Sequence, residues 1–460
     1  MSKIALLTIA DSREDFLEVR KPFIFEELKS LDWLRNMYDL VESDIITTEK
    51  NIKKFAQLAI EEKVECLIIH IPIWADPILS IKIQNYIKVP MLILGNDKPE
   101  TSSIVGILGA GGALNQIGCE HVRIFEHREP EARKNIEAFI KSVHAMNSLR
   151  GQVLGMFGSR SLGIFTTVAD PAQLQKLFDV DIKYFDQMEL VEQAQLIDST
   201  KVEAYKEWLI KKTGSLAYGG LFTEDAFDRQ VRSFLATEEF AAQKELDFVC
   251  VKCQQELSDG YTSQCLAHML SNGTIDRNGK KEAMVHACES DVDGALTMKL
   301  LNVLSGGKAT ALLDIRYFDR VNKYWAFANC GAVAADFFFT SEDKSGLSSI
   351  SVVPHLFGKA GGCALSGVLS QQTVTMARFC RKNGEYWMAI LRGEIMTPQN
   401  GELDNVTSAF PKGLIKTSAG DDFLEVFDSN HLHIVSGDYI QELIHFCALK
   451  KIPYKLWDNE

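Results

Sequence analysis

Long apolar runs are missing from this sequence of 460 residues. No stretch approaches the roughly 18–20 apolar residues that a membrane helix needs, and Asp11 and Arg13 end the short apolar run near the N-terminus, so we predict no signal peptide. An excess of basic residues is missing too, because 49 Lys and Arg face 62 Asp and Glu, which gives a net charge of −13. Nucleic acid and anionic lipid bind to basic faces, so neither is an expected partner.

Disulfide and zinc motifs are equally scarce. The ten cysteines are scattered and lie mostly in apolar surroundings, as Cys66 and Cys447 do. That distribution is typical of reduced, buried thiols in a cytosol. Cys250 and Cys253 form a single CxxC pair without a second pair or nearby histidines, which gives little support for a zinc or redox site. We therefore predict a cytoplasmic protein.

Short apolar runs alternate with helical patterns through the first two thirds of the chain. At this length more than one core is expected, and the alternation divides into a first domain, 1–150, and a second, 151–305. Continuous apolar strands separated by helices predict parallel sheets covered on both faces. Residues 306–460 contain short β-rich runs between Gly and Pro. The predicted fold class is α/β, with two doubly wound parallel-sheet domains before a β-rich, mainly antiparallel, barrel-like C-terminal domain.

Two acidic residues stand out by their local context. Glu289 follows an apolar run and precedes a predicted helix, for which Asp291 or Asp293 is the better cap, so Glu289 is left without a structural role. Asp314 ends the apolar run Ala-Thr-Ala-Leu-Leu. An unpaired buried carboxylate is costly, so Asp314 needs either a bound cation or an ion pair with Arg316.

Two histidines share one face of a predicted strand near the C-terminus, His431 and His433. A histidine in such a strand usually packs in a core or at its rim, so this position alone does not make either one a ligand. Carboxylate oxygens and an imidazole are a set that suits a hard divalent cation with positions left open for substrate. Together with Glu289 and Asp314, one of these histidines predicts a metal site.

Other candidate residues follow predicted strands. Lys252 and Gln254 begin a polar loop at the carboxyl end of a strand, where the ligands of open α/β sheets collect, although a solvated loop is the alternative. Trp74 either stacks on a sugar or packs in a core. The glycines of 106–112 form either a phosphate-binding loop or a tight turn between a strand, predicted from residue 104, and a helix.

These segments together resemble the L-fucose isomerase and L-arabinose isomerase superfamily, in particular its fucose isomerase-like branch. The resemblance spans the chain and is strongest from residue 151 on. It is carried by Gly-Ser-Arg-Ser-Leu-Gly at 158–163, Lys-Cys-Gln-Gln-Glu-Leu-Ser-Asp-Gly-Tyr at 252–261, Glu-Ser-Asp-x-x-Gly-Ala-Leu-Thr-Met at 289–298, Leu-Asp-Ile-Arg at 313–316 and Asn-His with Gly-Asp-Tyr at 430–439.

The resemblance implies a metal-dependent aldose–ketose isomerase that acts on an open-chain sugar through a cis-enediol. Glu289, Asp314 and His431 are the implied ligands of Mn²⁺, or of another divalent cation such as Co²⁺ or Mg²⁺, and the two acids are the implied catalytic residues. A homohexamer is the implied assembly, in which Trp74 reaches the site of a neighbouring subunit. The predicted substrate-binding residues are Arg13, Trp74, Lys252, Gln254 and Asn430.

Two positions depart from the family pattern. Asn329 stands where the arabinose branch has a second histidine ligand, which favours three protein ligands. Lys252 replaces a glutamine of the sugar pocket, so a sulfonated, phosphorylated or acidic sugar is predicted unless this lysine points away. Two alternative functions stay open: an NAD-dependent oxidoreductase that uses Gly106–Gly112, and a non-catalytic sugar-binding protein.

Overall fold

The chain folds into two compact units. The computed structural model describes residues 3–331, 333–399, 401–404, 406 and 411–458. The first unit contains Met1–Asn147 and Gln441–Lys451, and the second contains Ser148–Ile440 and Ile452–Glu460. The division of the second unit into a central and a C-terminal domain stays a prediction.

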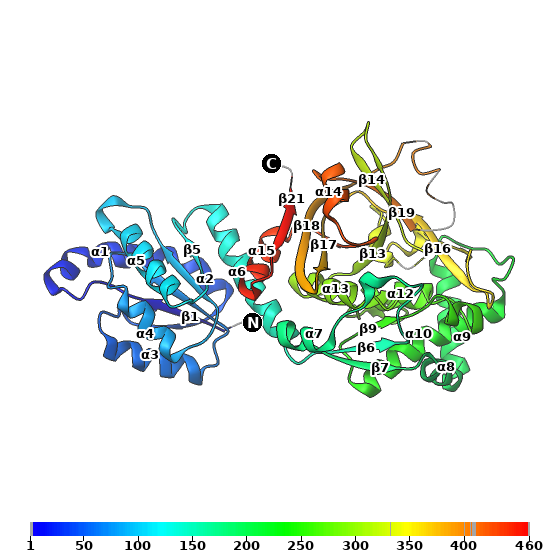
Figure 1. Cartoon of the computed structure of the whole chain (residues 1–460), viewed down its shortest axis with the longest axis horizontal. Helices are drawn as coiled ribbons and strands as arrows, with labels where there is room; N and C mark the ends of the chain where they lie inside the picture. Colours follow the sequence, from blue (N-terminus) through cyan, green and yellow to red (C-terminus); the bar gives the residue numbers. More distant parts are fainter. Residues whose placement is uncertain (1–2, 332, 400, 405, 407–410, 459–460) are drawn as a thin grey trace. The chain divides into compact units, whose positions relative to one another are not determined.

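The first unit is built on a parallel sheet, as predicted (Figure 1, blue to cyan). Its strand order is β2-β1-β3-β4-β5, and every pairing is parallel. Alternate side chains of one strand enter separate cores: Ala5 and Leu7 pack into one cluster, Ile4 and Leu6 into another. The strands are β1 (Lys3–Thr8), β2 (Asp39–Glu42), β3 (Cys66–Ile71), β4 (Met91–Gly95) and β5 (His121–Ile124).

Helices supply the apolar side chains of both clusters. The cluster around Leu7 contains residues of α3 (Glu49–Glu61), α4 (Ile78–Tyr86) and α5 (Ser103–Gln116). The cluster around Leu6 contains residues of α2 and α6, and of the C-terminal helix α15, which belongs to this unit from Gln441 on. The other helices of this unit are α1 (Glu14–Ser30), α2 (Asp32–Met37), α6 (Pro130–Leu149) and α15 (Ile440–Lys450).

The prediction for the glycine-rich segment of this unit was wrong. Residues 104–108 are not a strand, and Gly106–Gly112 is not a loop, because the whole segment lies inside helix α5. Gly106 allows this helix to pack closely, since a Cβ there would lie 2.7 Å from a side-chain carbon of Ile71. A short apolar run with glycines is ambiguous between strand and helix, and here the helix forms. The oxidoreductase alternative loses the loop on which it depended.

The second unit also contains a parallel sheet, with the strand order β12-β9-β6-β7. Its strands are β6 (Val153–Phe157), β7 (Asp181–Phe185), β9 (Phe248–Val251) and β12 (His286–Cys288). The helices of this part are α7 (Pro171–Phe178), α8 (Gln187–Leu196), α9 (Ser199–Lys212), α10 (Glu224–Lys244), α11 (Glu256–Gly260), α12 (Cys265–Asn272) and α13 (Val292–Leu304). Whether this sheet is doubly wound in the sense predicted stays open.

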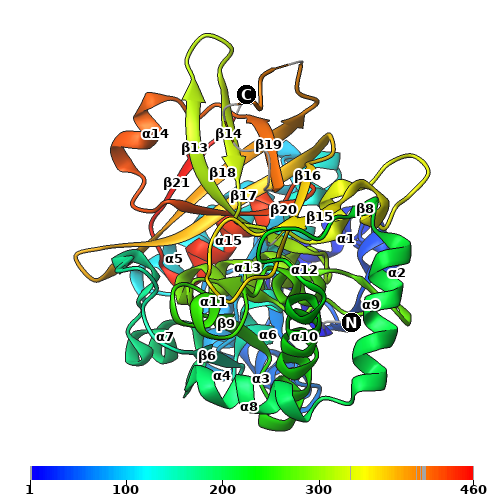
Figure 2. The ribbon, with the colours of Figure 1, turned by 90° about the vertical axis from the view of Figure 1, so that its right-hand side faces the viewer.

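The C-terminal half forms a large, mostly antiparallel sheet with the order β21-β18-β17-β20-β13-β14-β19-β16-β15-β8. An additional pairing of β18 with β19 closes part of this sheet into a ring. The ring contains, in order, β18, β17, β20, β13, β14 and β19. Figure 2 shows β13, β14 and β19 side by side. The strands are β8 (Ser215–Leu216), β13 (Thr310–Asp319), β14 (Tyr324–Ala328), β15 (Ser351–Pro354), β16 (Cys363–Val368), β17 (Gln372–Lys382), β18 (Glu385–Met396), β19 (Pro411–Lys416), β20 (His431–Ser436) and β21 (Tyr454–Trp457).

Helix α13 joins the parallel sheet to the ring of strands. It contacts β9 and β12 of the sheet and β13, β17 and β20 of the ring. Its apolar side chains are almost all buried, as expected of a helix that is hydrophobic all round. The start of α13 therefore lies where the end of β12 meets β13 and β20. None of the helices in the described part of the chain is both long and apolar enough to cross a bilayer.

Candidate metal and sugar site

Asp314 and His431 are cross-strand neighbours. Strands β13 and β20 pair antiparallel in a register that sets Asp314 opposite His431. Residues directly opposite each other in such a pair point to the same face of the sheet. Nε2 of His431 lies 3.6 Å from Oδ1 of Asp314. The register of one strand pair thus brings together two groups that are far apart in the sequence.

Glu289 reaches the same imidazole from the turn between β12 and α13. Its Oε2 lies 3.2 Å from Nε2 of His431. Glu289 and Ser290 both have left-handed backbones, with φ of 59° and 51°. This conformation costs free energy in residues other than glycine, and such backbone strain is concentrated at functional sites. Oε2 of Glu289 is buried and has no hydrogen-bond partner of acceptable geometry in the described residues.

Asp291 holds the other side of the His431 ring. Nδ1 of His431 donates to Oδ2 of Asp291 at 2.8 Å, and the guanidinium of Arg378 donates to both oxygens at 2.6 and 3.1 Å. Asp291 also caps α13, as predicted, by accepting from the backbone N–H of Gly294 at 2.9 Å. A carboxylate behind a histidine fixes its tautomer and leaves Nε2 free to bind a metal.

Neither Arg378 nor the second role of Asp291 was predicted from the sequence. Arg378 lies in the middle of β17 and is 1% exposed. The sequence did contain a hint of the Arg378 ion pair, because an arginine inside a strand of otherwise buried residues requires a buried acidic partner. The identity of that partner depends on the fold, since Asp291 is distant in sequence.

The charges around His431 shift its pKa. Burial alone would lower it, but the hydrogen bond to Asp291 and the close carboxylate of Glu289 raise the pKa of His431 to about 10. Burial raises the pKa of Asp314 to about 6, although His431 acts in the opposite direction. Asp291 is also buried, yet the nearby Arg378 and His431 hold its pKa well below its usual range. In this state a protonated imidazole occupies the space between the carboxylates.

His433 lies on the same strand face but in a different environment. It is opposite Leu312 in the register and packs against α13, where a Cβ added to Gly294 would lie 2.6 Å from its Nε2. Burial lowers the pKa of His433 to about 3, so its ring is neutral. The carboxylates of Glu289 and Asp314 meet His431, and this geometry favours His431 as the ligand.

The residues present fit a hard divalent cation. Two carboxylates and an imidazole converge, a carboxylate orients the imidazole from behind, and the buried Oε2 of Glu289 accepts no hydrogen bond from any described residue. Oxygen-rich sets of this kind suit Mn²⁺ or Mg²⁺. Arg316, the competing partner of Asp314, is exposed beside a break in the register of β13 and β14. Among the described residues, no ion pair joins it to Asp314.

Three predicted substrate residues lie in the second unit. Asn430 reaches the site, with its Nδ2 3.5 Å from Oδ1 of Asp314. Lys252, at the carboxyl end of β9, is 8% exposed and pairs through Nζ with Oε1 of Glu256 at 2.7 Å. Gln254 follows it, and its backbone carbonyl accepts from the Ser161 hydroxyl at 2.8 Å. The 158–163 loop is thus attached to the segment that carries Lys252 and Gln254.

The two other predicted substrate residues lie together in the first unit. The guanidinium of Arg13 lies 5.3 Å from the ring centroid of Trp74, a distance at which a cation and an aromatic face attract each other. Asp11 fixes Arg13 by accepting from its Nε at 3.0 Å. Trp74 is partly exposed. These residues form a small polar and aromatic surface after the ends of β1 and β3.

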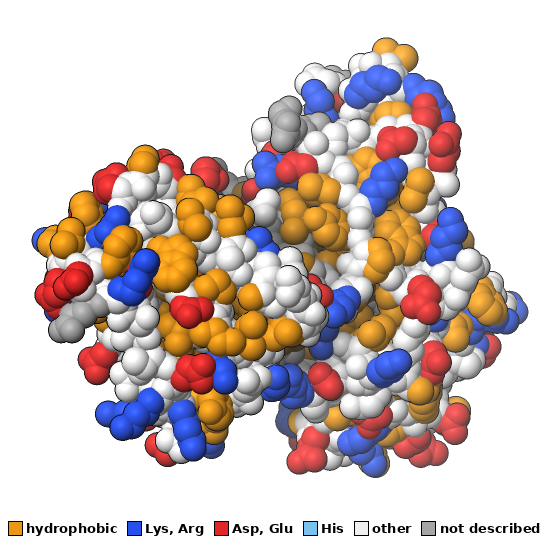
Figure 3. Space-filling view, turned by 60° about the vertical axis from the view of Figure 1, so that its left-hand side comes forward, with side chains coloured by type: hydrophobic (Ala, Val, Ile, Leu, Met, Phe, Trp, Pro, Cys, Tyr) orange, Lys and Arg blue, Asp and Glu red, His pale blue; other side chains and the backbone are white. Residues whose placement is uncertain are grey.

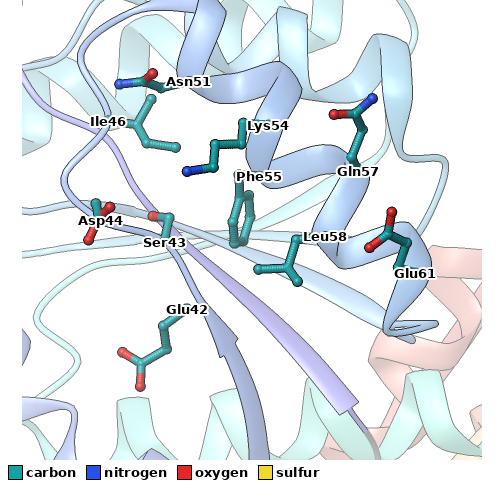
Figure 4. A pocket seen from close by; sticks show the side chains of 10 residues that line it. All are labelled: Glu42, Ser43, Asp44, Ile46, Asn51, Lys54, Phe55, Gln57, Leu58 and Glu61. Carbon is teal, nitrogen blue, oxygen red and sulfur yellow. The ribbon is translucent and has the colours of Figure 1, made fainter.

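The first unit also has a pocket of about 440 Å³ at the end of β2 (Figure 4). Side chains of α3 such as Lys54, Phe55 and Leu58 form one wall, and Ser43 and Asp44 lie across from them. The backbone N–H of Thr8 donates to the hydroxyl of Ser43, so this residue has a structural role. The pocket contains none of the predicted site residues.

A family model and curated relatives both point to sugar isomerases. Residues 327–458 match the model of the L-fucose isomerase C-terminal domain. The whole chain is similar to a sulfoquinovose isomerase from Priestia megaterium, with 21% identity over 99% of this chain and 100% of the relative. A sulfoquinovose isomerase from Alkalicoccus urumqiensis is 24% identical over 45% of this chain and 44% of its own. A solute-binding protein of an ABC transporter from Burkholderia multivorans gives a TM-score of only 0.17 at 13% identity, covering 67% of this chain and 94% of that protein.

Proposed function

We propose that this chain, which is similar to fucose isomerase-like sugar isomerases, interconverts an aldose and a ketose at Glu289, Asp314 and His431. The observation that carries the proposal is the meeting of both carboxylates at one imidazole, 3.2 and 3.6 Å from its Nε2. These three residues would hold Mn²⁺ or a similar cation. When bound, the cation supplies Lewis-acid polarisation of the sugar carbonyl.

The two carboxylates then move one proton between neighbouring carbons. One takes the proton from the carbon that bears a hydroxyl while the neighbouring carbonyl oxygen gains a proton, which gives a cis-enediol. The carbon proton then returns to the former carbonyl carbon, and the hydroxyl oxygen on the first carbon gives up its proton to become the new carbonyl. No atom is gained or lost, which an isomerisation requires. In the metal-free site burial raises the pKa of Asp314 to about 6, and a bound cation favours the carboxylate form that can accept a proton from carbon. Asp291 and Arg378 act through His431 as positioning residues.

We propose further that the sugar is anionic and carries a sulfonate. The relatives named above are sulfoquinovose isomerases, and Lys252 is a nearly buried cation at the carboxyl end of β9. The Glu256 side chain that pairs with Lys252 is 58% exposed. An ion pair to such an exposed side chain is weak, so a sulfonate can replace Glu256 at modest cost. Ser159, whose hydroxyl lies 3.5 Å from the Lys252 ammonium, is a second donor.

The test is turnover by a Glu289→Gln variant loaded with Mn²⁺. Removing one acid–base group is expected to cost on the order of 10²–10⁴-fold in kcat, while circular dichroism shows an unchanged fold. Glu192→Gln, at an exposed position on α8, is the matched control and should keep normal activity. Normal turnover by Glu289→Gln would show that this carboxylate is not part of the reaction.

The substrate class is tested separately. A panel of sulfoquinovose, L-fucose and L-arabinose is incubated with the native protein in deuterium oxide, and exchange at C1 or C2 is followed by NMR. We expect exchange on the sulfonated sugar, and a Lys252→Gln variant should raise KM for it more than it lowers kcat. Exchange on the neutral sugars alone would refute the anionic substrate and leave the isomerase chemistry intact.

A further inference from the structure

A second group of potential metal ligands lies in the second unit. Cys265 begins helix α12, Cys330 follows β14, and His355 follows β15. One ligand atom of each residue lies within 4.8 Å of the ligand atoms of the other two. Three separate segments of the chain therefore converge on one point; Figure 2 labels the elements α12, β14 and β15 next to them.

Local contacts orient these side chains. The thiol of Cys265 donates to the backbone carbonyl of Cys330 at 3.1 Å, and Nε2 of His355 lies 3.1 Å from the same carbonyl. Cys265 is fully buried, whereas Cys330 and His355 are partly exposed. An ion from solution therefore has access from the side of Cys330 and His355.

The chemistry of this set differs from that of the carboxylate site. Two sulfurs and one nitrogen are soft or borderline donors, which select Zn²⁺ and related cations over Mn²⁺ or Mg²⁺. Contacts with the thiols of Cys265 and Cys288 and with His355 hold the pKa of Cys330 well below its usual range. A thiolate is the form that binds a metal.

We propose that Cys265, Cys330 and His355 form a second metal site, specific for a thiophilic divalent cation such as Zn²⁺. Tetrahedral zinc takes Cys and His ligands of this kind, with the fourth position taken by water. Binding displaces the thiol proton of Cys265 into solvent. Two metal–sulfur bonds, to Cys265 and Cys330, and one metal–nitrogen bond, to His355, then form. The ion ties together the segments after β14 and β15 and the start of α12.

This site goes beyond the proposed isomerase function and does not depend on it. Cys288 precedes Glu289 in sequence, and Cys330 lies two residues beyond Ala328, the register partner of Asp314. A bound soft cation would thus sit beside the elements that carry both catalytic acids. The sulfur ligands give this ion a spectroscopic signature that the carboxylate site cannot produce.

The test is a Cd²⁺ titration of the reduced, chelator-treated protein, followed by thiolate-to-cadmium charge-transfer absorption in the ultraviolet. One equivalent per chain is expected to produce the band. Cys330→Ser and Cys265→Ser should each weaken binding at least tenfold, and His355→Gln should weaken it less. Cys119→Ser, at a half-exposed cysteine of the first unit, is the matched control and should leave the band unchanged. Glu289→Gln should also leave it unchanged.

X-ray absorption of the native protein loaded with one Zn²⁺ keeps the test independent of any variant that fails to fold. Sulfur neighbours at about 2.3 Å are expected. A first shell of oxygen and nitrogen alone, or an ultraviolet band that persists in Cys330→Ser, would overturn the proposal. Loss of the band in Glu289→Gln would also overturn it, because the ion would then belong to the carboxylate site.

Discussion

His431 is surrounded by three carboxylates and is held as a cation by them. Asp291 accepts a hydrogen bond from Nδ1 of His431, and Glu289 and Asp314 face its Nε2. A metal ion and a proton therefore compete for the same nitrogen. Because ligands must be deprotonated to bind, a raised histidine pKa makes metal affinity depend strongly on pH.

We predict that Mn²⁺ binding near pH 7 releases about one proton from His431, whose pKa is about 10 without the ion. Calorimetry in buffers of different ionisation enthalpy measures this number. In Asp291→Asn the proton is held less firmly, so fewer protons should be released, and metal affinity should fall about 10–100-fold because the ring loses its orienting partner. A binding heat that is independent of buffer would contradict the prediction.

The same residues set how the metal-free protein responds to pH. The pKa of His431 is raised above its usual value of 6.5, so its contribution to folding stability is complete below about pH 6.5 and is lost as pH rises through about 10. The pKa of Asp314 is raised from 3.8 to about 6, so its contribution to stability is complete below about pH 3.8 and is lost as pH rises to about 6. A bound cation reverses both trends, since it favours the deprotonated groups.

At the level of elements, the pairing of β13 with β20 creates the site. Both strands were predictable from their apolar runs, and a family resemblance pointed to Glu289, Asp314 and His431. The register that sets Asp314 opposite His431 could not be predicted, because it joins strands separated by most of the C-terminal half. Nothing in the local sequence encodes such a pairing.

The same distinction between local sequence and long-range contacts explains which other elements could be predicted. Parallel strands such as β3 were predictable because they are continuous apolar runs that are buried on both faces. Helix α5 was not, because its apolar, glycine-containing sequence has no periodic polar face. Arg378 was missed because its partner Asp291 lies on a different element. Local sequence patterns thus predicted individual helices and strands, whereas contacts between these elements became known only from the structure.

The start of α13 is predicted to be intolerant of added volume. A Cβ at Gly294 would lie 2.6 Å from Nε2 of His433 and 2.7 Å from Cγ of Asp291. Gly294→Ala should therefore lower the free energy of unfolding by about 1–3 kcal/mol and weaken metal binding by moving Asp291. Urea denaturation and Mn²⁺ titration measure the two effects. Gly260→Ala, where an added Cβ meets open space, is the matched control. Equal stability of the two variants would contradict the prediction.

At the scale of the whole molecule, the first unit has an apolar surface that is unusual for a protein in water. Helix α5 contains no charged residue, and Val105 and Leu108 are 57% and 52% exposed on it. The view in Figure 3 shows apolar side chains gathered over a broad area of one face. Apolar patches of this kind mark interaction surfaces. We propose that α5 is covered by another copy of the chain.

Leu108→Glu is expected to disrupt this assembly, because it places a charge where apolar surface would be buried. Sedimentation velocity should show smaller species than the native protein. If a neighbouring subunit supplies Trp74 to the site, as the family resemblance implies, isomerase activity should fall together with assembly. Leu196→Glu, at another exposed leucine on α8, is the matched control. An unchanged sedimentation coefficient for Leu108→Glu would exclude α5 from the interface.

The path of the chain between the two units limits how they can be separated. The chain leaves the first unit after Asn147, comes back for Gln441–Lys451, and adds β21 to the second unit at the very end. Neither unit is therefore a single stretch of the gene. A chimera made by exchanging residues 1–147 between relatives would keep a foreign α15, so recombination is expected to succeed only when that helix is exchanged with its own partner segment.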